Sequence, residues 1–336
     1  MSKILVTGGA GFIGSHTVVE LVQAGYTPVI VDNLSNSNAS VLEGIERITG
    51  IPCAFYHVDC TVESDLRAVF EKAGPFEGVI HFAAFKAVGD SVKHPLKYYH
   101  NNLNSTRVLL QLMHEFGTRL LVFSSSCTVY GQPESNPVSE DTPLAEAKSP
   151  YGYTKQICER MIHDTAQAGP LGAVLLRYFN PVGAHPSGLI GELPLGVPEN
   201  LIPYITQTAA GLRSSLTVFG NDYDTPDGTC IRDYIHVVDL AKAHVAALSW
   251  LNLNGSGCET FNLGSGAGNS VQEVIDTFTR VTGVALNYSV GPRRAGDVEQ
   301  IFATASKANT HLQWRCEKSL ADALIDAWNW QKKLMQ

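Results

Sequence analysis

The chain opens with a short apolar run that enters a cluster of glycines. Ile4 to Val6 form the run, and residues 8–14 read Gly-Gly-Ala-Gly-Phe-Ile-Gly. Apolar residues at helical spacing follow at once, so the sequence predicts a strand, a tight turn and a helix. Glycines in such a turn let the backbone bend, approach a pyrophosphate and pack the helix against the strand. This opening favours a dinucleotide-binding fold.

An acidic residue ends the second predicted strand and bears on which dinucleotide would bind. Residues 28–31 are an apolar run, and Asp32 follows it. An acid there accepts hydrogen bonds from the adenosine ribose and repels a 2′-phosphate, so NAD is favoured over NADP. The pyrophosphate would lie on unpaired N–H groups at the start of the first helix. The alternative is a glycine-rich turn with no such ligand, and the strand, helix and acid around it argue against that.

Composition narrows the class of protein. The 336 residues are 44% hydrophobic and 17% charged, which is typical of a globular chain long enough for two lobes. The net charge of −8 gives no electrostatic reason to bind nucleic acid or an anionic membrane. Seven cysteines without zinc-type spacing indicate reduced thiols and no metal site. With no signal-peptide pattern and no membrane-spanning apolar run, we expect a cytoplasmic protein.

Short apolar runs alternate with helical patterns through the first half of the chain. This alternation predicts an α/β fold with a doubly wound, Rossmann-like parallel sheet, in which ligands collect at the carboxyl ends of the strands. It lapses after residue 180, where residues 181–199 are rich in Gly and Pro. We expect residues 1–180, with a return segment near 231–265, to bind the dinucleotide. Residues 181–336 would form mainly a smaller C-terminal substrate-binding lobe.

Two further elements at this sheet edge carry candidate chemistry. A predicted strand ends in serines 124–126, and Tyr151 and Lys155 lie four residues apart on one face of the next helix. A hydroxyl beside a carbon that gives up hydride needs a base, and phenol, with a pKa near 10, is a poor one. An ammonium about 5 Å away would stabilise the phenolate by about 3 kcal/mol. We therefore expect Lys155 to lower the pKa of Tyr151; the alternative is an ordinary pair on a helix face.

Longer motifs carry a resemblance to a known family. Residues 177–188 read Arg-Tyr-Phe-Asn-Pro-Val-Gly-Ala-His-Pro-Ser-Gly, residues 232–237 read Arg-Asp-Tyr-Ile-His-Val, and residues 292–297 read Pro-Arg-Arg-Ala-Gly-Asp. Together with the glycine turn, the serines and the Tyr-Lys pair, they resemble the UDP-glucose 4-epimerases of the extended short-chain dehydrogenase/reductase superfamily. The resemblance runs from residue 2 to about residue 330.

The resemblance implies roles for particular residues. Three would be catalytic: Ser126, Tyr151 and Lys155. Besides these three, the residues that would line NAD are Gly8, Gly11, Phe12, Ile13, Gly14, Asp32, Asn33, Leu34, Ser35, Asn36, Ser37, Asp59, Cys60, Phe82, Ala83, Ala84, Phe85, Lys86, Asn101 and Phe179. The UDP-sugar would contact Lys86, Ser126, Tyr151, Asn180, Asn200, Leu201, Thr217, Phe219, Arg232, Arg294, Asp297 and Ile301, with the arginines on its diphosphate.

The implied reaction interconverts UDP-galactose and UDP-glucose, a step of galactose metabolism. Tyr151 would remove the proton of the sugar 4-hydroxyl while NAD accepts hydride, and the 4-keto sugar would be reduced again on its other face. Members of the family are commonly homodimers that hold NAD tightly. Ile301 departs from the family pattern, where tyrosine or smaller residues are common. Acceptance of UDP-N-acetylhexosamines is therefore left open.

Several rival functions share this scaffold. Sugar-nucleotide dehydratases and decarboxylases carry acids just before Val-Tyr-Gly, whereas residues 126–128 here read Ser-Cys-Thr. A net UDP-sugar dehydrogenase or reductase remains the enzymatic alternative. A dinucleotide-sensing regulator is the non-enzymatic one, but it would not need Tyr151 and Lys155, and both are present.

Overall fold

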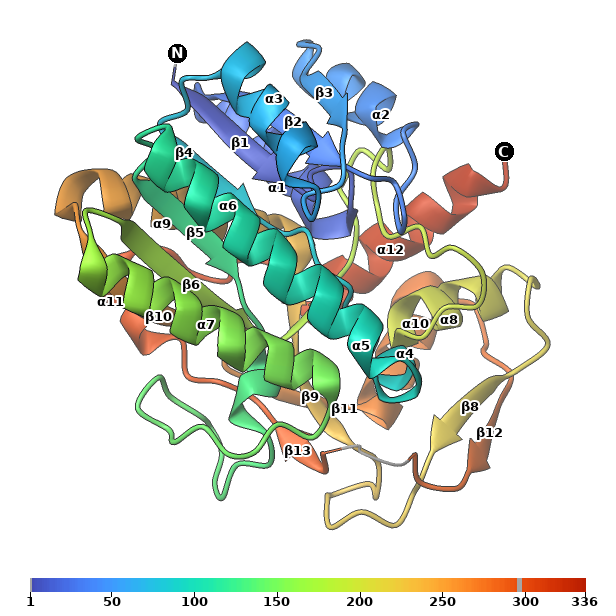
Figure 1. The fold of residues 1–336 in the computed structure, drawn as a ribbon. Helices are drawn as coiled ribbons and strands as arrows, with labels where there is room; N and C mark the ends of the chain where they lie inside the picture. Colours follow the sequence, from blue (N-terminus) through green and yellow to red (C-terminus); the bar gives the residue numbers. More distant parts are fainter. Residues whose placement is uncertain (1, 295–297) are drawn as a thin grey trace.

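Seven strands form one parallel sheet in the computed structural model, which describes residues 2–294 and 298–336 (Figure 1). Across the sheet the order is β3–β2–β1–β4–β5–β6–β10. The strands are β1 (Lys3–Thr7), β2 (Thr27–Asp32), β3 (Ala54–His57), β4 (Gly78–His81), β5 (Leu120–Ser124), β6 (Gly172–Tyr178) and β10 (Gly257–Leu263). The doubly wound α/β sheet predicted from the sequence is confirmed.

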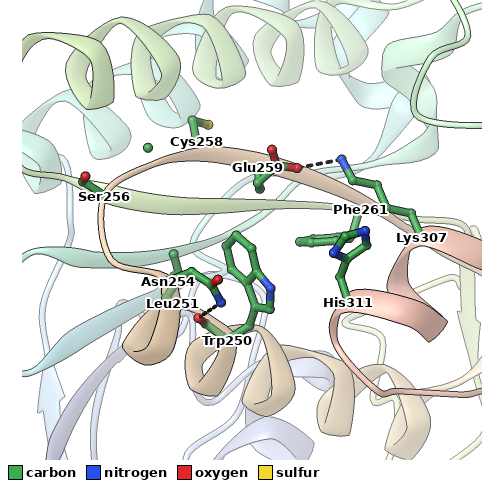
Figure 2. Close-up of a pocket in the computed structure, with 10 residues that line it drawn as sticks. Trp250, Leu251, Asn254, Ser256, Cys258, Glu259, Phe261, Lys307 and His311 are labelled. Carbon is green, nitrogen blue, oxygen red and sulfur yellow. Dashed lines mark hydrogen bonds and ion pairs between the residues drawn. The ribbon is translucent and has the colours of Figure 1, made fainter.

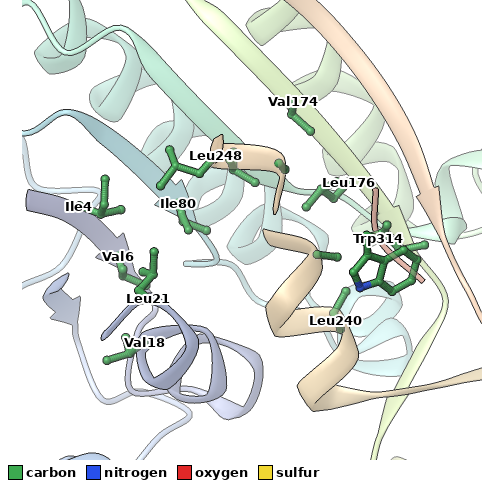
Figure 3. Packing of buried hydrophobic residues seen from close by; sticks show 14 of the residues in the cluster. Ile4, Val6, Val18, Leu21, Ile80, Val174, Leu176, Leu240, Leu248 and Trp314 are labelled. Atoms are coloured by element: carbon green, nitrogen blue, oxygen red, sulfur yellow. The ribbon is translucent and has the colours of Figure 1, made fainter. Parts of the chain in front are cut away.

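Helices cover both faces of this sheet, and a hydrophobic core lies on each side. On one side are α1 (Phe12–Gln23), α2 (Val41–Thr49) and α9 (Val237–Asn254); on the other are α3 (Glu63–Ala73), α6 (Asn104–Glu115) and α7 (Pro150–Ala168). Ile4 and Val6 point into the first core, shown in Figure 3, and Leu5 into the second. Because both faces are buried, the strands are almost entirely apolar.

The chain reverses its direction of progress across the sheet at β1. One neighbour of β1 is β2 and the other is β4, so the crossovers leave β1 on opposite sides. In open parallel sheets ligands bind at such a switch point, outside the carboxyl ends of the strands. The glycine turn after β1 and the segment after β4 meet there.

A second lobe lies beyond the carboxyl ends of the main sheet (Figure 1). Its four-stranded sheet contains β7 (Asn180–Val182), β9 (Ile231–His236), β11 (Gly268–Ser270) and β13 (Gln300–Ile301), while β8 (Leu216–Phe219) pairs with β12 (Tyr288–Gly291). The helices α8 (Leu201–Ala209), α10 (Val271–Thr282) and α12 (Leu320–Leu334) share a separate apolar core in which Ile205, Phe278 and Leu324 are buried. Between β9 and β11 the chain returns to the main sheet through α9 and β10, and α11 (Ser306–His311) packs against β10.

One stretch differs from the sequence prediction of a single helix from about Leu96 to Phe116. It divides into α5 (Pro95–Tyr98), a π-helical turn η1 (Tyr99–Leu103) and α6, preceded by the short helix α4 (Val88–Lys93). A π-helical turn is often found at a functional site because it redirects side chains. The turn here carries Asn101 and Asn102. In the part of the chain described, no helix has the length and apolar character needed to cross a bilayer.

Candidate active site

The glycine turn is closed so tightly that side chains do not fit at two of its positions. Gly8 has φ +71°, and a Cβ there would lie 2.8 Å from the backbone nitrogen of Ala83. A Cβ on Gly14 would lie 2.2 Å from the carbonyl oxygen of Gly8. Gly11 is the N-cap of α1, and no side chain described here caps that helix. The turn thus presents the first N–H groups of α1, as the binding of a dinucleotide pyrophosphate requires.

Asp32 is fixed beside this turn by three hydrogen bonds. One carboxylate oxygen accepts from the Ala10 backbone N–H at 3.1 Å. The other accepts from the Leu34 N–H at 2.9 Å and from the Ser37 hydroxyl at 2.8 Å. The acid predicted to meet the adenosine ribose is therefore buried and held in one orientation.

The end of β3 adds a second acid to this edge. Asn33 donates to Asp59 at 3.0 Å, and Thr61 donates to it from its N–H and its hydroxyl. Burial by itself raises the pKa of Asp59, but the hydrogen bonds from Thr61 and Asn33 outweigh it and leave the pKa below its usual value. Burial raises the pKa of Cys60, so this thiol is a packing group. Two of the predicted cofactor residues, Ser35 and Asn36, are exposed.

Asn102 clamps the segment that follows β4, and sequence reasoning missed this role. Its side chain accepts from the Phe85 N–H at 2.8 Å and donates to the Phe85 carbonyl at 3.0 Å and to Thr154 at 3.0 Å. Asn101, which the sequence analysis predicted instead, donates to Asn102 at 3.0 Å. The segment contains the predicted residues Phe82, Ala83, Ala84 and Lys86. A buried asparagine inside a helix is the signal that would have found the clamp, because its amide needs partners.

Ser124, the last residue of β5, and Ser125 fix the segment that follows this strand. The hydroxyls of Ser124 and Tyr178 lie 2.6 Å apart. Ser125 donates to Glu159 at 2.5 Å, and the same carboxylate forms a buried, two-point ion pair with Arg177. A buried ion pair with all its hydrogen bonds made holds Glu159, and through it Ser125, in one orientation.

The third serine faces the predicted base. Ser126 caps the short helix η2 (Cys127–Tyr130) and hydrogen-bonds the phenol of Tyr151. Lys155, on the next turn of α7, donates to the Ser124 carbonyl at 2.7 Å and is buried. The structure therefore brings Ser126, Tyr151 and Lys155 together at the carboxyl end of β5.

The pKa of Tyr151 is raised in this structure, whereas the sequence analysis expected Lys155 to lower it. Burial raises the pKa of Tyr151 well above 10, and the hydrogen bond from Ser126 offsets this only in part. Burial also lowers the pKa of Lys155, to about 8. Both shifts have one cause, since a low-dielectric site disfavours each charged form. The spacing in the sequence could not show how deeply both groups are buried.

The small lobe approaches the predicted catalytic residues through β9 and β13. Phe179 and Ile301 are buried in one apolar cluster, against which Cys127 packs. Burial raises the pKa of Cys127 to about 12, and the positive charge of Arg232 opposes the shift. The Arg232 charge therefore acts on Cys127, in the segment after β5 that also contains Ser126. Asn180 begins β7, which pairs with β9.

The remaining predicted substrate residues lie farther out on the small lobe. The guanidinium of Arg294 lies 5.7 Å from the ring centroid of Phe219, which is 45% exposed at the end of β8. Thr217 lies two residues earlier on the same strand. Asn200 and Leu201 form the N-cap and first residue of α8. Asp297 lies outside the described residues.

Comparison with known proteins identifies the family. The profile of the NAD dependent epimerase/dehydratase family matches residues 4–264. The chain belongs to this family. Among members similar to it is the UDP-glucose 4-epimerase of Dictyostelium discoideum, 53% identical over 98% of this chain and 95% of that protein. Another is that of Bacillus subtilis (strain 168), 51% identical over 98% of this chain and 96% of that protein.

Solved structures of this epimerase/dehydratase fold agree. The UDP-glucose 4-epimerase of Stenotrophomonas maltophila, with bound NAD and formylated UDP-arabinopyranose, superposes with a TM-score of 0.96 at 48% identity, covering 100% of this chain and 99% of that one. The enzyme of Bifidobacterium longum, in complex with NAD⁺ and UDP, gives 0.96 at 47% identity over 99% and 98%. The family resemblance predicted from the motifs is confirmed.

A hollow of about 380 Å³, separate from the candidate active site, lies beside the amino-terminal half of β10 (Figure 2). Trp250, Phe261 and His311 face it, and an ion pair of 2.6 Å between Lys307 and Glu259 crosses one side. Of the predicted site residues that the structure describes, none lines this hollow. The described chain also contains no group of three or more His, Cys, Asp or Glu placed to hold a metal ion.

Proposed function

We propose that this protein is a UDP-glucose 4-epimerase, which interconverts UDP-galactose and UDP-glucose with NAD as its cofactor. The observation that carries the proposal is the grouping of Ser126, Tyr151 and Lys155 beside a glycine turn that fits a dinucleotide. Membership of the NAD dependent epimerase/dehydratase family supports it, as do relatives named UDP-glucose 4-epimerase that match nearly the whole chain.

The residues present fit NAD. In this proposal the turn at Gly8, Gly11 and Gly14 meets the pyrophosphate, and Asp32 accepts from the adenosine ribose. Lys155, fixed by the Ser124 carbonyl, has further N–H donors for the nicotinamide ribose. When bound, NAD supplies the acceptor and donor of the two electrons that leave and rejoin the sugar. Because the electrons return to the same sugar, the reaction has no net oxidation.

Tyr151 moves the proton in this mechanism. Its buried phenol is neutral in the protein alone, so it becomes a base only where further positive charge stabilises the phenolate. The oxidised nicotinamide carries such a charge. Tyr151 then takes the proton of the sugar 4-hydroxyl, with Ser126 holding the same oxygen, and returns it when the other face of the sugar is reduced. In this proposal Tyr151 can remove the proton only when oxidised NAD is bound.

The small lobe would hold the nucleotide while the hexose turns. Arg232 and Arg294 are proposed for the diphosphate, and Phe219, Asn180 and Asn200 for the rest of the UDP-sugar. Ile301 would border the hexose, because it packs with Phe179 near the catalytic loop. Its intermediate size leaves the use of N-acetylated sugars open, as the sequence did.

A homodimer is part of the proposal, and an exposed apolar strip supports it. Val92 and Leu96, on α4 and α5, are 62% and 79% exposed, and Tyr153 on α7 lies with its ring 6.4 Å from that of Tyr99. Such a patch on one face is typical of a protein–protein contact. Leu96→Asp should shift the mass measured by light scattering toward one chain.

The seven free cysteines support the prediction of a cytoplasmic enzyme.

The test of function is conversion of UDP-galactose by the purified protein without added NAD. We expect UDP-glucose to form, with no net NADH. Stoichiometric NADH on addition of NAD would mean a net dehydrogenase. Binding of NAD without conversion of any UDP-hexose would mean a dinucleotide-sensing regulator.

A further inference from the structure

One carboxylate, Glu192, contacts residues from both sides of the candidate site. Its Oε1 lies 3.4 Å from the Lys86 ammonium and 2.6 Å from the Asn200 amide nitrogen. Lys86 follows β4 in the nucleotide-binding half, whereas Asn200 starts α8 in the small lobe. Glu192 therefore joins the two halves across the proposed sugar-binding side, and neither the motifs nor the family resemblance assigned it a role.

The backbone around Glu192 is fixed. Ile190 is fully buried in the core of the nucleotide-binding half. A Cβ on Gly191 would lie 2.5 Å from the ring of Trp330, and the Trp330 indole donates to the Glu192 carbonyl at 3.0 Å. The Glu192 side chain is only 13% exposed, whereas that of Lys86 is 45% exposed. When these partners separate, the lysine has the freedom to move.

Charge makes this contact consequential. A carboxylate that has lost most of its contact with water needs partners, and here a cation and an amide supply them. Lys86 and Asn200 are also residues that the family resemblance places on the UDP-sugar, which is anionic. The ammonium and amide that satisfy Glu192 are then the groups the substrate must engage.

We propose that Glu192 is a positioning residue that holds Lys86 and Asn200 until a nucleotide sugar displaces it. It competes with the substrate for these two donors and so weakens ground-state binding. The inference rests on the proposed function and deepens it. It predicts an effect on binding rather than on the chemical step. Among the residues that the structure describes, Glu192 forms its side-chain contacts with Lys86 and Asn200 and no hydrogen bond or ion pair with Ser126, Tyr151 or Lys155.

The experiment compares Glu192→Gln with the wild-type holoenzyme. The variant keeps the shape of the side chain and removes its charge. Because a partly exposed ion pair is weak, we expect KM for UDP-galactose and the inhibition constant of UDP to fall about two- to fivefold, with kcat nearly unchanged. Unchanged or weaker binding of both ligands would overturn the proposal.

Two controls separate competition from a general field effect. Glu199→Gln removes the same charge from an exposed glutamate next to Asn200, and it should change UDP binding less than Glu192→Gln does. In a Lys86→Met background, Glu192→Gln should lose most of its benefit, because the contested cation is gone. An equal gain in that background would mean that Glu192 merely repels the nucleotide, which contradicts the proposal.

Failure of the inference and failure of the function give different results. If the wild type does not interconvert the UDP-hexoses, the proposed function fails. If the wild type is active and the folded variant binds as it does, only the role of Glu192 fails. Thermal unfolding and NAD content establish that the variant is folded, and Glu192→Ala, which also releases Lys86, provides a second variant with the same expected direction.

Discussion

The two sides of the candidate site are built from different materials. On the cofactor side, backbone atoms set the shape: Gly8 and Gly14 leave no room for a Cβ, and backbone N–H groups of Ala10 and Leu34 hold Asp32. On the sugar side the shape is set by partly exposed side chains. Phe219 is one of these, at the end of β8 in the small lobe, and Lys86 is another, in the segment that follows β4. Ser126, Tyr151 and Lys155, the proposed catalytic residues, lie at the carboxyl end of β5.

This difference suits a cofactor that stays and a sugar that turns. A shape set by backbone changes only if the turn itself refolds, so it favours one fixed ligand pose. A surface of side chains changes by rotamer shifts that cost about 0.5–2 kcal/mol each. Ligands on the two sides should therefore respond differently to substitution, and the following experiments test that expectation.

Tyr151→Phe should have the largest effect, because it removes the proton acceptor that both sides require. We expect kcat for UDP-galactose to fall about a hundred- to ten-thousandfold, the range of general base catalysis. NAD content and thermal stability should stay near wild type. Tyr153→Phe is the matched control. Tyr153 lies two residues after Tyr151 on α7, on a different face of the helix, and is 49% exposed. Equal activity of the Tyr151 variant would disprove the assignment of the base.

Gly14→Ala should weaken NAD binding. The added Cβ would lie 2.2 Å from the Gly8 carbonyl oxygen, so the turn must shift. Strain of about 1–3 kcal/mol from such overpacking corresponds to roughly 5- to 150-fold weaker NAD binding if the shift falls on the site. NAD released from the purified, denatured protein measures this. Gly89→Ala, where a Cβ meets nothing within 4 Å, should retain its NAD.

Acid should destabilise the protein, because the buried histidines on α1, β4 and α9 resist protonation. Burial lowers the pKa of His16 and His81 to about 3 and that of His244 to about 4. Below pH 6.5 the unfolded chain takes up protons that the folded chain refuses, so the free energy of unfolding falls as the pH drops toward these values.

Chemical denaturation at several pH values measures that slope. Each buried histidine contributes up to about 1.4 kcal/mol per pH unit between the two pKa values. His81→Gln should flatten the slope, whereas His114→Gln, at an exposed position of α6, should not. An unchanged slope in the His81 variant would mean that this imidazole is protonated in the folded protein.

Phe219→Ala should have the smallest effect and should fall on the sugar side alone. The variant loses the ring that Arg294 overlies, a partly exposed cation–π contact worth about 0.5–1 kcal/mol. We expect KM for UDP-galactose to rise about two- to fivefold, with NAD content unchanged. Leu212→Ala, another exposed apolar residue of the small lobe, should leave KM unaltered. A loss of NAD from the Phe219 variant would contradict the expectation that the two ligands respond separately to substitution.

Local patterns in the sequence predicted much of this site. The glycine turn, Asp32 and the pair Tyr151 and Lys155 are each defined within a few residues, where chain geometry dictates the structure. Asn102 escaped prediction because its partners lie 17 and 52 residues away, on the β4 exit and on α7. Spacing along the chain says nothing about which distant groups a side chain will meet.

The sequence by itself determined the parallel doubly wound sheet, the turn at its first strand and the residue types that gather at the strand ends, since these follow from hydrophobic period and local backbone preference. Only the tertiary structure decided that Glu192 spans the two halves and that the pKa of the Tyr151 phenol is raised by burial, where the sequence analysis expected Lys155 to lower it. These depend on solvent exclusion and on contacts between segments as many as 106 residues apart, which arise only when the whole chain packs.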